Sequence, residues 1–343
     1  MILLNLGIFI FTFAGTRWLM GAGNWLSSVA EPNHRSLHKK STPSGGGLAI
    51  VVGLLLIEVW QRFQGASFFP SPTALLGFVL VAGISFLDDR QPIRSSIRLT
   101  IHLAAAFCLV LGGSHELAIP LPGITDQPVD LGWLAIPFAL ILTVWFTNLY
   151  NFMDGMDGFA GGMTVFGFGG CAVLAWSSGD VSLALLCSVI ATSGAGFLCW
   201  NFPPAKIFMG DVAAAPLGYL VAMVVFLGVK HQSMDLWQPL ILFSPFWVDA
   251  TATLVRRLMK GDRIWEAHRT HAYQRLANAG WGHRKTALAE YALMATMAGA
   301  AWQYGGLGAS PRLFMLGGLG LLFLLLWLAL RAAEKAHQKR ASE

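Results

Sequence analysis

The sequence predicts an all-α, polytopic membrane protein, and three observations carry that prediction. Of the 343 residues, 55% are hydrophobic and only 12% are charged, whereas about a quarter of the residues in soluble domains are charged. Several apolar stretches approach the roughly 20 residues that a helix needs to cross a hydrocarbon core. The chain also holds 38 glycines, and small residues let membrane helices pack closely. We therefore expect one integral membrane domain over residues 1–343, a bundle of about 10–11 transmembrane helices.

The first apolar stretch, residues 2–21, is too long for the core of a signal peptide, and no basic residue precedes it. We expect a retained anchor whose N-terminus lies outside. The other spans are expected at residues 46–61, 72–87, 97–113, 132–147, 159–177, 181–199, 212–229, 237–255, 287–304 and 312–330. An odd number of spans, eleven in all, places the C-terminus on the cytoplasmic side.

The distribution of positive charge agrees with this orientation, because Lys and Arg collect in cytoplasmic loops. Only a few basic residues fall nearer the other side or within a span, namely Arg17, Arg62, Lys230 and Arg312. The net charge of +5 therefore reports topology, and no nucleic-acid partner is expected. Residues 331–343 are expected to form a basic cytoplasmic tail that lies on anionic lipid headgroups.

The candidate site residues are most closely spaced in the stretch TNLYNFMDGMDGFAGG, residues 147–162. Four amides and carboxylates recur at every third residue, so on a helix they project from roughly one face: Asn148, Asn151, Asp154 and Asp157. Interleaved glycines let the backbone approach a ligand closely. Hard oxygen ligands of this kind suit Mg²⁺ together with a phosphate ester. The alternative is a polar helix end that meets water, and the regular spacing favours the site.

Two further acidic motifs fall on the same predicted side. Asp88 and Asp89 end the third span, where a carboxylate pair is expected at a watery rim or around a cation; an ordinary helix-end pair is the alternative. Asp211 follows Gly210 and opens the eighth span. A carboxylate there can simply cap the helix, or it can hold a metal that bridges to an anion bound at the helix N-terminus.

Basic and aromatic residues accompany these acids. Lys206 offers a point charge for phosphate, and Phe208 offers a ring that can stack on a base or simply pack. In HRTHAYQRL, His268, Arg269 and His271 can clamp a pyrophosphate, the alternative being a positive-inside loop with incidental histidines. In HKKSTPSGGG, lysines stand beside a Gly-rich turn that can wrap phosphate oxygens.

Two ionisable residues lie inside predicted spans. Asp249 is expected to pair with Arg256 or Arg257, one to two turns further on, because an unpaired carboxylate is costly in a bilayer. His102 is expected to form a satisfied interhelical hydrogen bond.

These motifs resemble those of the polyprenyl-phosphate N-acetylhexosamine-1-phosphate transferases, a membrane superfamily that includes phospho-MurNAc-pentapeptide translocase. The matching pieces, spread over residues 32–276, are PNHRSLHKKSTPSGGGLAI, FLDDR, NLYNFMDGMDGFAGG, NFPPAKIFMGD and HRTHAYQRL. The resemblance implies transfer of a sugar-1-phosphate from a UDP-N-acetylhexosamine to a polyprenyl phosphate, with release of UMP. It implies Mg²⁺ as cofactor, with Mn²⁺ as an alternative, and a reaction at the inner leaflet of a bacterial inner membrane. A homodimer is compatible with it.

The resemblance also implies roles for individual residues. The residues matching catalytic carboxylates are Asp88, Asp89, Asp154 and Asp157. Asp211 and Asp154 are the expected metal ligands, and Phe208 stands at the position that contacts uracil. The candidate substrate-binding residues are Lys39, Lys40, Asn148, Asn151, Asn201, Lys206, Phe208, His268, Arg269 and His271.

The last loop departs from the family pattern. Tyr273 and Gln274 stand where an HxHH signature would have its later histidines, and Ala213–Ala214 replace a common Gly-Ser. The altered loop favours an enzyme that initiates lipopolysaccharide O-antigen or another surface polysaccharide, and sugar selectivity is expected in residues 256–286. The alternatives are the peptidoglycan translocase itself and, from another class, a secondary transporter, which would place its carboxylates near the bilayer midplane.

Overall fold

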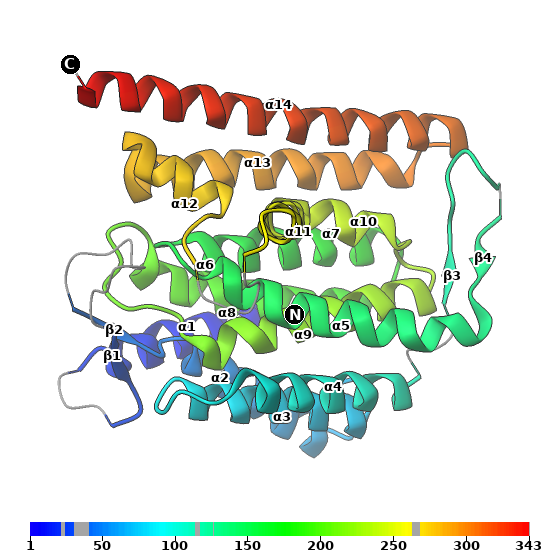
Figure 1. Cartoon of the computed structure of the whole chain (residues 1–343). Helices are drawn as coiled ribbons and strands as arrows, with labels where there is room; N and C mark the ends of the chain where they lie inside the picture. Colours follow the sequence, from blue (N-terminus) through cyan, green and yellow to red (C-terminus); the bar gives the residue numbers. More distant parts are fainter. Residues whose placement is uncertain (22–24, 31–40, 114–116, 126, 263–267, 343) are drawn as a thin grey trace.

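The computed structural model describes residues 1–21, 25–30, 41–113, 117–125, 127–262 and 268–342. The all-α prediction is confirmed: strands occur there only in two short antiparallel pairs (Figure 1). The first half contains α1 (Ile2–Leu19), β1 (Ser28–Ala30), β2 (Thr42–Ser44), α2 (Leu48–Phe63), α3 (Pro72–Asp88), α4 (Ser95–Leu111), β3 (Ala118–Ile119), β4 (Val129–Asp130) and α5 (Ala135–Met153). The second half contains α6 (Phe159–Met163), a π-helical turn (Thr164–Phe168), α7 (Gly169–Ser177), α8 (Val181–Asn201), α9 (Asp211–Lys230), α10 (Trp237–Leu242), α11 (Ser244–Met259), α12 (Ala272–Leu276), α13 (Gly282–Gly305) and α14 (Ala309–Ser342).

The helices of this bundle support a multi-pass membrane protein. Within the described ranges, six segments are long and apolar enough to cross a bilayer, judged by length and composition: Ile2–Leu19, Gly132–Met153, Phe159–Ser177, Val181–Asn201, Asp211–Lys230 and Ala309–Lys339. The helices α3 and α4 are shorter and also apolar. Six described helices meet this criterion, against eleven predicted spans. The structure therefore confirms a bundle with several spanning helices.

One predicted span and the predicted tail differ from the structure. Residues 237–255 do not form one helix, because α10 ends at Leu242 and α11 starts at Ser244. Pro245 in the first turn of α11 has no N–H to donate, so a helix cannot continue through it undisturbed. In Figure 1, α11 is seen nearly end-on, across the direction of its neighbours. The basic tail is not a separate segment either, since α14 runs without interruption to Ser342.

The core of the bundle is α9, which is buried over nearly its whole length. Small residues make this possible, because they let neighbouring backbones come close. A Cβ at Gly218 would collide with the carbonyl of Phe146 on α5. On the other side, the Tyr219 hydroxyl donates to the Ala74 carbonyl of α3 at 2.9 Å. The first residue of α9, Asp211, is therefore held in a fixed place between α3 and α5.

The two ends of the bundle differ in chemistry. At one end lie the β1–β2 pair and α12, with the last turns of α3, α5 and α8 and the first turn of α9; at the other end lies the β3–β4 pair (Figure 1). All five predicted acidic residues belong to the first end. The second end contains a cavity of about 740 Å³ between the β3–β4 pair and the ends of α7, α9 and α13.

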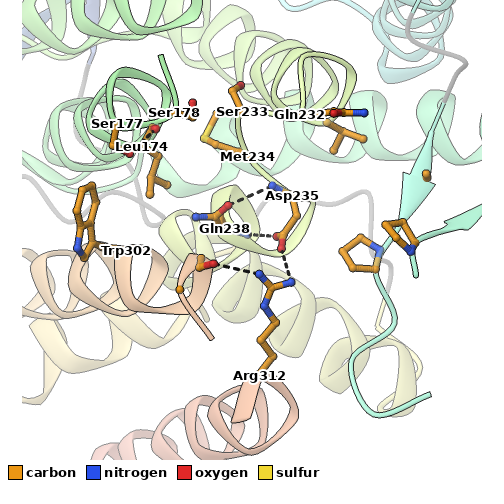
Figure 2. Close-up of a pocket in the computed structure, with 16 residues that line it drawn as sticks. Leu174, Ser177, Ser178, Gln232, Ser233, Met234, Asp235, Gln238, Trp302 and Arg312 are labelled. Carbon is orange, nitrogen blue, oxygen red and sulfur yellow. Dashed lines mark hydrogen bonds and ion pairs between the residues drawn. The ribbon is translucent and has the colours of Figure 1, made fainter. Parts of the chain in front are cut away.

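An ion pair braces this second end, as Figure 2 shows. Asp235 lies 3.3 Å from Arg312 and accepts hydrogen bonds from the N–H groups of Trp237 at 2.9 Å and Gln238 at 3.2 Å. Burial raises the pKa of Asp235, and the Arg312 charge opposes that rise. Arg312 also donates to the carbonyl of Tyr304 at 3.2 Å. These contacts join the α9–α10 connection to α13 and α14.

Candidate active site

Asp89 connects the end of α3 to the start of α9. Its two carboxylate oxygens accept hydrogen bonds from the backbone N–H groups of Asp211 and Val212, each at 2.9 Å. Those N–H groups have no partner within their own helix, and the positive end of the helix dipole favours a negative charge there. Burial raises the pKa of Asp89, whereas the two N–H donors lower it. A half-buried carboxylate is thus fixed at the N-terminus of the central helix.

Arg98, in the first turn of α4, joins two further acids. Its guanidinium donates a short hydrogen bond to Asp88 and lies 3.4 Å from the Asp211 carboxylate. Asp88 also accepts from the Ile93 N–H at 2.7 Å. Sequence reasoning gave Arg98 no role in the site. The signal that identifies it is an arginine one turn inside an otherwise apolar helix, where an unpaired charge would be costly.

The end of α5 completes the acidic cluster. The Asn151 amide donates to Asp211 at 2.9 Å, and Asp154 directly follows the last helical residue, Met153. Burial raises the pKa of Asp154 well above its usual range, and the nearby charges of Asp211 and Asp89 raise it further. We call Asp88, Asp89, Asp154 and Asp211, together with Arg98 and Asn151, the acidic cluster. The structure brings these four of the five predicted carboxylates together at one end of the bundle.

The predicted helical face of four polar residues is only partly right. Because α5 ends at Met153, Asp157 lies in the following turn, which is closed by Gly158 at a φ of 74°. Asn148 donates to the Val144 carbonyl of its own helix at 2.7 Å and not to the cluster.

Asp157 instead ties its turn to neighbouring segments. It is buried, accepts from the Ala205 N–H at 3.0 Å and lies 2.9 Å from a ring nitrogen of His283, a residue that sequence reasoning did not single out. Asn201, at the end of α8, also connects this turn to the segment before Asp211. It accepts from the Gly158 N–H at 2.9 Å and donates to the Ile207 carbonyl at 2.9 Å.

The Gly-rich turn packs against the segment before Asp211 and does not present its amides as a phosphate loop. The N–H groups of Gly46 and Gly47 donate to the carbonyls of Phe208 and Met209 at 2.9 and 3.0 Å, and the Phe208 N–H donates to Pro43 at 2.9 Å. A Cβ at Gly47 would collide with Ala213, so this close approach requires glycine. Half-buried Phe208 is therefore placed by backbone pairing. Lys39 and Lys40 lie outside the described residues.

The predicted partner of Asp249 is wrong. Its carboxylate accepts from the N–H groups of Ala272 at 2.8 Å and Tyr273 at 3.2 Å and lies 3.6 Å from a ring nitrogen of buried His271. The first turn of α12 offers N–H groups without a partner in their own helix, and these can satisfy a carboxylate in place of an arginine. Arg256 instead donates to the Thr270 carbonyl at 2.5 Å.

The histidine and arginine side chains of this loop lie at the same end of the bundle. The rings of His268 and His271 are 4.8 Å apart, and Arg269 is exposed. Of these three side chains, only that of Arg269 is exposed to solvent, where it can contact a ligand. Lys206 does not point its ammonium group at any of the acids in the described structure; its Nζ lies 4.9 Å from the centre of the Trp200 ring.

His102 also differs from its prediction. It is buried on α4, and within the described part of the chain neither ring nitrogen meets a hydrogen-bond partner. The side chain that faces it from α5 is Asn148, one of whose N–H groups donates to the Val144 carbonyl, so the predicted contact between α4 and α5 is present without a well-aligned hydrogen bond.

Tyr273 and Gln274 are both buried, which changes the expected role of these two residues. The Tyr273 hydroxyl donates to the Phe152 carbonyl at 3.3 Å and leaves no room for a Cβ at Gly155. The Gln274 side chain accepts from the His271 N–H at 3.3 Å. They support the turn that carries Asp154 and do not line a surface that a sugar can touch.

We therefore expect Tyr273→His to slow turnover of all donors alike and not to change their ranking. Losing the hydroxyl contact leaves the Phe152 carbonyl unpaired, at a cost of about 1–3 kcal/mol, and frees the turn that holds Asp154. The measurement is the relative rate with several sugar donors for wild type and variant. Tyr273→Phe, which keeps the ring and loses only the hydroxyl, should slow all donors in the same way; a changed donor ranking in Tyr273→His would instead assign sugar selectivity to this position.

The acidic cluster has the chemistry of a divalent-cation site without a finished coordination sphere. No group of three or more His, Cys, Asp and Glu side chains in the described structure is arranged to hold a metal ion. The carboxylates are engaged with N–H donors and Arg98. Their oxygens are nevertheless the hard ligands that Mg²⁺ prefers, and the mutual repulsion that raises the pKa of Asp154 is what a cation would relieve.

Fold and site together define a multi-pass membrane protein with an acidic, arginine-containing site at one end of its helix bundle. The comparisons with known proteins agree with that class. Residues 71–229 match the family model described as glycosyl transferase family 4. The chain belongs to that family, the polyprenyl-phosphate N-acetylhexosamine-1-phosphate transferases, as its motifs predicted.

Three relatives illustrate the similarity. The probable undecaprenyl-phosphate N-acetylglucosaminyl 1-phosphate transferase of Bacillus subtilis is 32% identical over 269 residues, which cover 78% of this chain and 74% of the relative. The decaprenyl-phosphate N-acetylglucosaminephosphotransferase of Mycobacterium leprae is 30% identical, with 84% and 80% covered. A phospho-N-acetylmuramoyl-pentapeptide-transferase of Geobacillus thermodenitrificans is 31% identical, with 74% and 81% covered. Membership of a transferase family leaves the transporter alternative without support.

Proposed function

We propose that this protein transfers an N-acetylated sugar-1-phosphate from a UDP-sugar to undecaprenyl phosphate and releases UMP at the cytoplasmic face of the bacterial inner membrane. The observation that carries the proposal is the acidic cluster, in which four carboxylates and Arg98 meet at one end of the bundle. Relatives named as N-acetylglucosaminyl phosphotransferases support the choice of an N-acetylated sugar.

The reaction joins two anionic phosphates, so its main requirement is the neutralisation of charge. An oxygen of the lipid phosphate attacks the sugar-linked phosphorus of the donor, and the bond to UMP breaks. Asp154 and Asp211 would hold Mg²⁺, which would neutralise the diphosphate when bound. Arg98 bridges Asp88 and Asp211, offsets the repulsion between these two acids and is a permanent cation beside the reacting groups. Arg269, which is exposed, would bind diphosphate oxygens in a fork.

We further propose that the product initiates lipopolysaccharide O-antigen or a related surface polysaccharide. The last loop supports this choice over peptidoglycan synthesis, because it carries Tyr273 and Gln274 in place of histidines. Relatives of the peptidoglycan type are also similar in sequence, so the donor panel must include both kinds of substrate.

The test is UMP release by the purified protein with undecaprenyl phosphate and a panel of UDP-N-acetylhexosamines, against UDP-MurNAc-pentapeptide. We expect release with a UDP-N-acetylhexosamine and none above background with the pentapeptide donor. Release with the pentapeptide donor alone would replace this proposal by the peptidoglycan one, and no release with any donor would contradict the transferase activity.

Removal of divalent cations is expected to abolish UMP release, and Mg²⁺ or Mn²⁺ to restore it. The physical reason is that the carboxylates of the acidic cluster would repel a diphosphate unless a cation stands between them. The measurement is initial rate after EDTA treatment, with and without added cation, and Ca²⁺-loaded EDTA is the control for effects of the chelator itself. Full activity in metal-free buffer would rule out the metal role.

A further inference from the structure

The side chains of Arg17 and Lys206 both contact the indole ring of Trp200, where α1 packs against α8. The Arg17 guanidinium carbon lies 5.8 Å from the centre of the Trp200 ring, and the Lys206 ammonium lies 4.9 Å from it. Trp200 itself is held in place, since its Nε1 donates to the Phe13 carbonyl at 3.0 Å and its ring centre is 4.9 Å from that of Phe13. Residues from three separate segments therefore build one positively charged surface.

The positive charge of this surface is not balanced by an ion pair within the described part of the chain. Both cations are exposed, and among the residues that the structure describes neither forms an ion pair. Cation–π contact contributes only about 0.5–1 kcal/mol at exposed sites, and it leaves the repulsion between two like charges at one ring without a counter-charge. A bound anion would relieve that repulsion, and long flexible stems let both head groups reach it.

The surroundings of the surface select an amphiphilic anion. Phe9 and Phe13 precede Arg17 at intervals of four residues, so the three lie on one face of α1, and the two rings stack at 6.2 Å. Only 22% of the α1 span is buried by the rest of the molecule, so most of this helix faces lipid. Trp18 beside it is 61% exposed, as expected of an indole at the membrane–water boundary. A ligand bound here would lay its chains along Phe9 and Phe13.

We propose that Arg17, Trp200 and Lys206 form a binding site for the headgroup phosphate of an anionic phospholipid. The site differs from the acidic cluster in its charge and in the helices that build it. It does not rest on the proposed transferase reaction, because the binding requires neither the sugar donor nor the lipid acceptor.

The site is also joined to the acidic end of the bundle through one short segment. The Lys206 N–H donates to the Trp200 carbonyl at 2.9 Å. The preceding residue, Ala205, donates its N–H to Asp157 at 3.0 Å. A headgroup that restrains Lys206 therefore restrains the segment that holds the turn between Asp154 and Gly158. Bound phospholipid is expected to raise the thermal stability of the purified protein.

The test uses the full chain in neutral detergent, with phosphatidylglycerol or zwitterionic phosphatidylcholine added, and counts bound lipids by native mass spectrometry. We compare wild type, the double variant Arg17→Gln/Lys206→Gln and the charge-conserving Arg17→Lys/Lys206→Arg. The matched control is Lys260→Gln, which removes an exposed charge just after α11. Wild type, the charge-conserving variant and the control should bind phosphatidylglycerol in preference to phosphatidylcholine. The double glutamine variant should bind it at least about tenfold more weakly, a loss of about 1.4 kcal/mol.

Thermal unfolding without added lipid establishes that each variant is folded. Equal retention of the two lipids by wild type, or undiminished phosphatidylglycerol binding by the folded double glutamine variant, would overturn the proposal. A third arm adds undecaprenyl phosphate in excess. Displacement of phosphatidylglycerol by that lipid would assign the surface to the acceptor substrate and would overturn the phospholipid assignment; persistence of the phosphatidylglycerol adduct supports it.

Discussion

Asp89→Asn is expected to lower the rate of UMP release by on the order of 100-fold, the effect that a misplacement of about 1 Å has on a reacting pair. Asparagine has one acceptor oxygen, and its amide group would face the second of the two N–H donors at the start of α9. The first turn of α9, with Asp211, must then shift relative to α3. The charge that stabilises this helix terminus is lost at the same time.

The control for this variant is Asp262→Asn, the same substitution at an exposed residue after α11. The rate of UMP release and the thermal midpoint should be measured for both variants. We expect Asp262→Asn to behave as wild type. An Asp89→Asn protein that turns over at the wild-type rate would show that the link between α3 and α9 is unimportant for the reaction.

Arg98→Gln is expected to reduce kcat/KM by about 100-fold or more, because it removes a cation that contacts both Asp88 and Asp211. The two carboxylates would then repel each other and the anionic substrates. Arg98→Lys should recover only part of the loss, since an ammonium group is a single point charge and cannot reproduce the planar fork of a guanidinium.

Arg94→Gln provides a matched control for Arg98. Arg94 precedes Arg98 by one helical turn at the start of α4, and its side chain is exposed. The same charge is lost, so an equal fall in both variants would mean that only the overall positive potential of this end matters. A selective fall in Arg98→Gln would identify the contact with the two acids as the cause.

Local spacing was enough to predict much of the candidate site. Asn151 and Asp154 were found because amides and carboxylates interrupt an apolar run at regular intervals, and Asp211 because it opens a helix after Gly210. Their convergence was predicted from the topology alone. Two motifs lie on the same side of the membrane when an even number of spans separates them. The all-α fold could be predicted for a similar reason, since composition and apolar run length report directly on the bilayer.

Contacts between distant backbone segments were not predictable in this way. Nothing in the sequence periodicity indicates that Gly46 donates to Phe208, or that Asp157 accepts from Ala205. Arg98 was overlooked because its contact with Asp211 joins residues that are 113 positions apart in the sequence, and no local spacing links it to that acid. Sequence patterns indicate which side chains are costly to bury, whereas the partner that offsets the cost depends on the packing of the whole bundle.

The hydrogen bonds between Asp249 on α11 and the first turn of α12 allow the amino-acid sequence of that turn to vary. Asp249 holds the backbone N–H groups of residues 272 and 273, and every amino acid except proline supplies such a group. The side chains at these two positions can therefore be exchanged while the tether remains. Substitution of both residues should therefore alter the turn that they pack against and leave α12 attached to α11. Only a proline at one of these positions should release α12, because it removes an N–H donor.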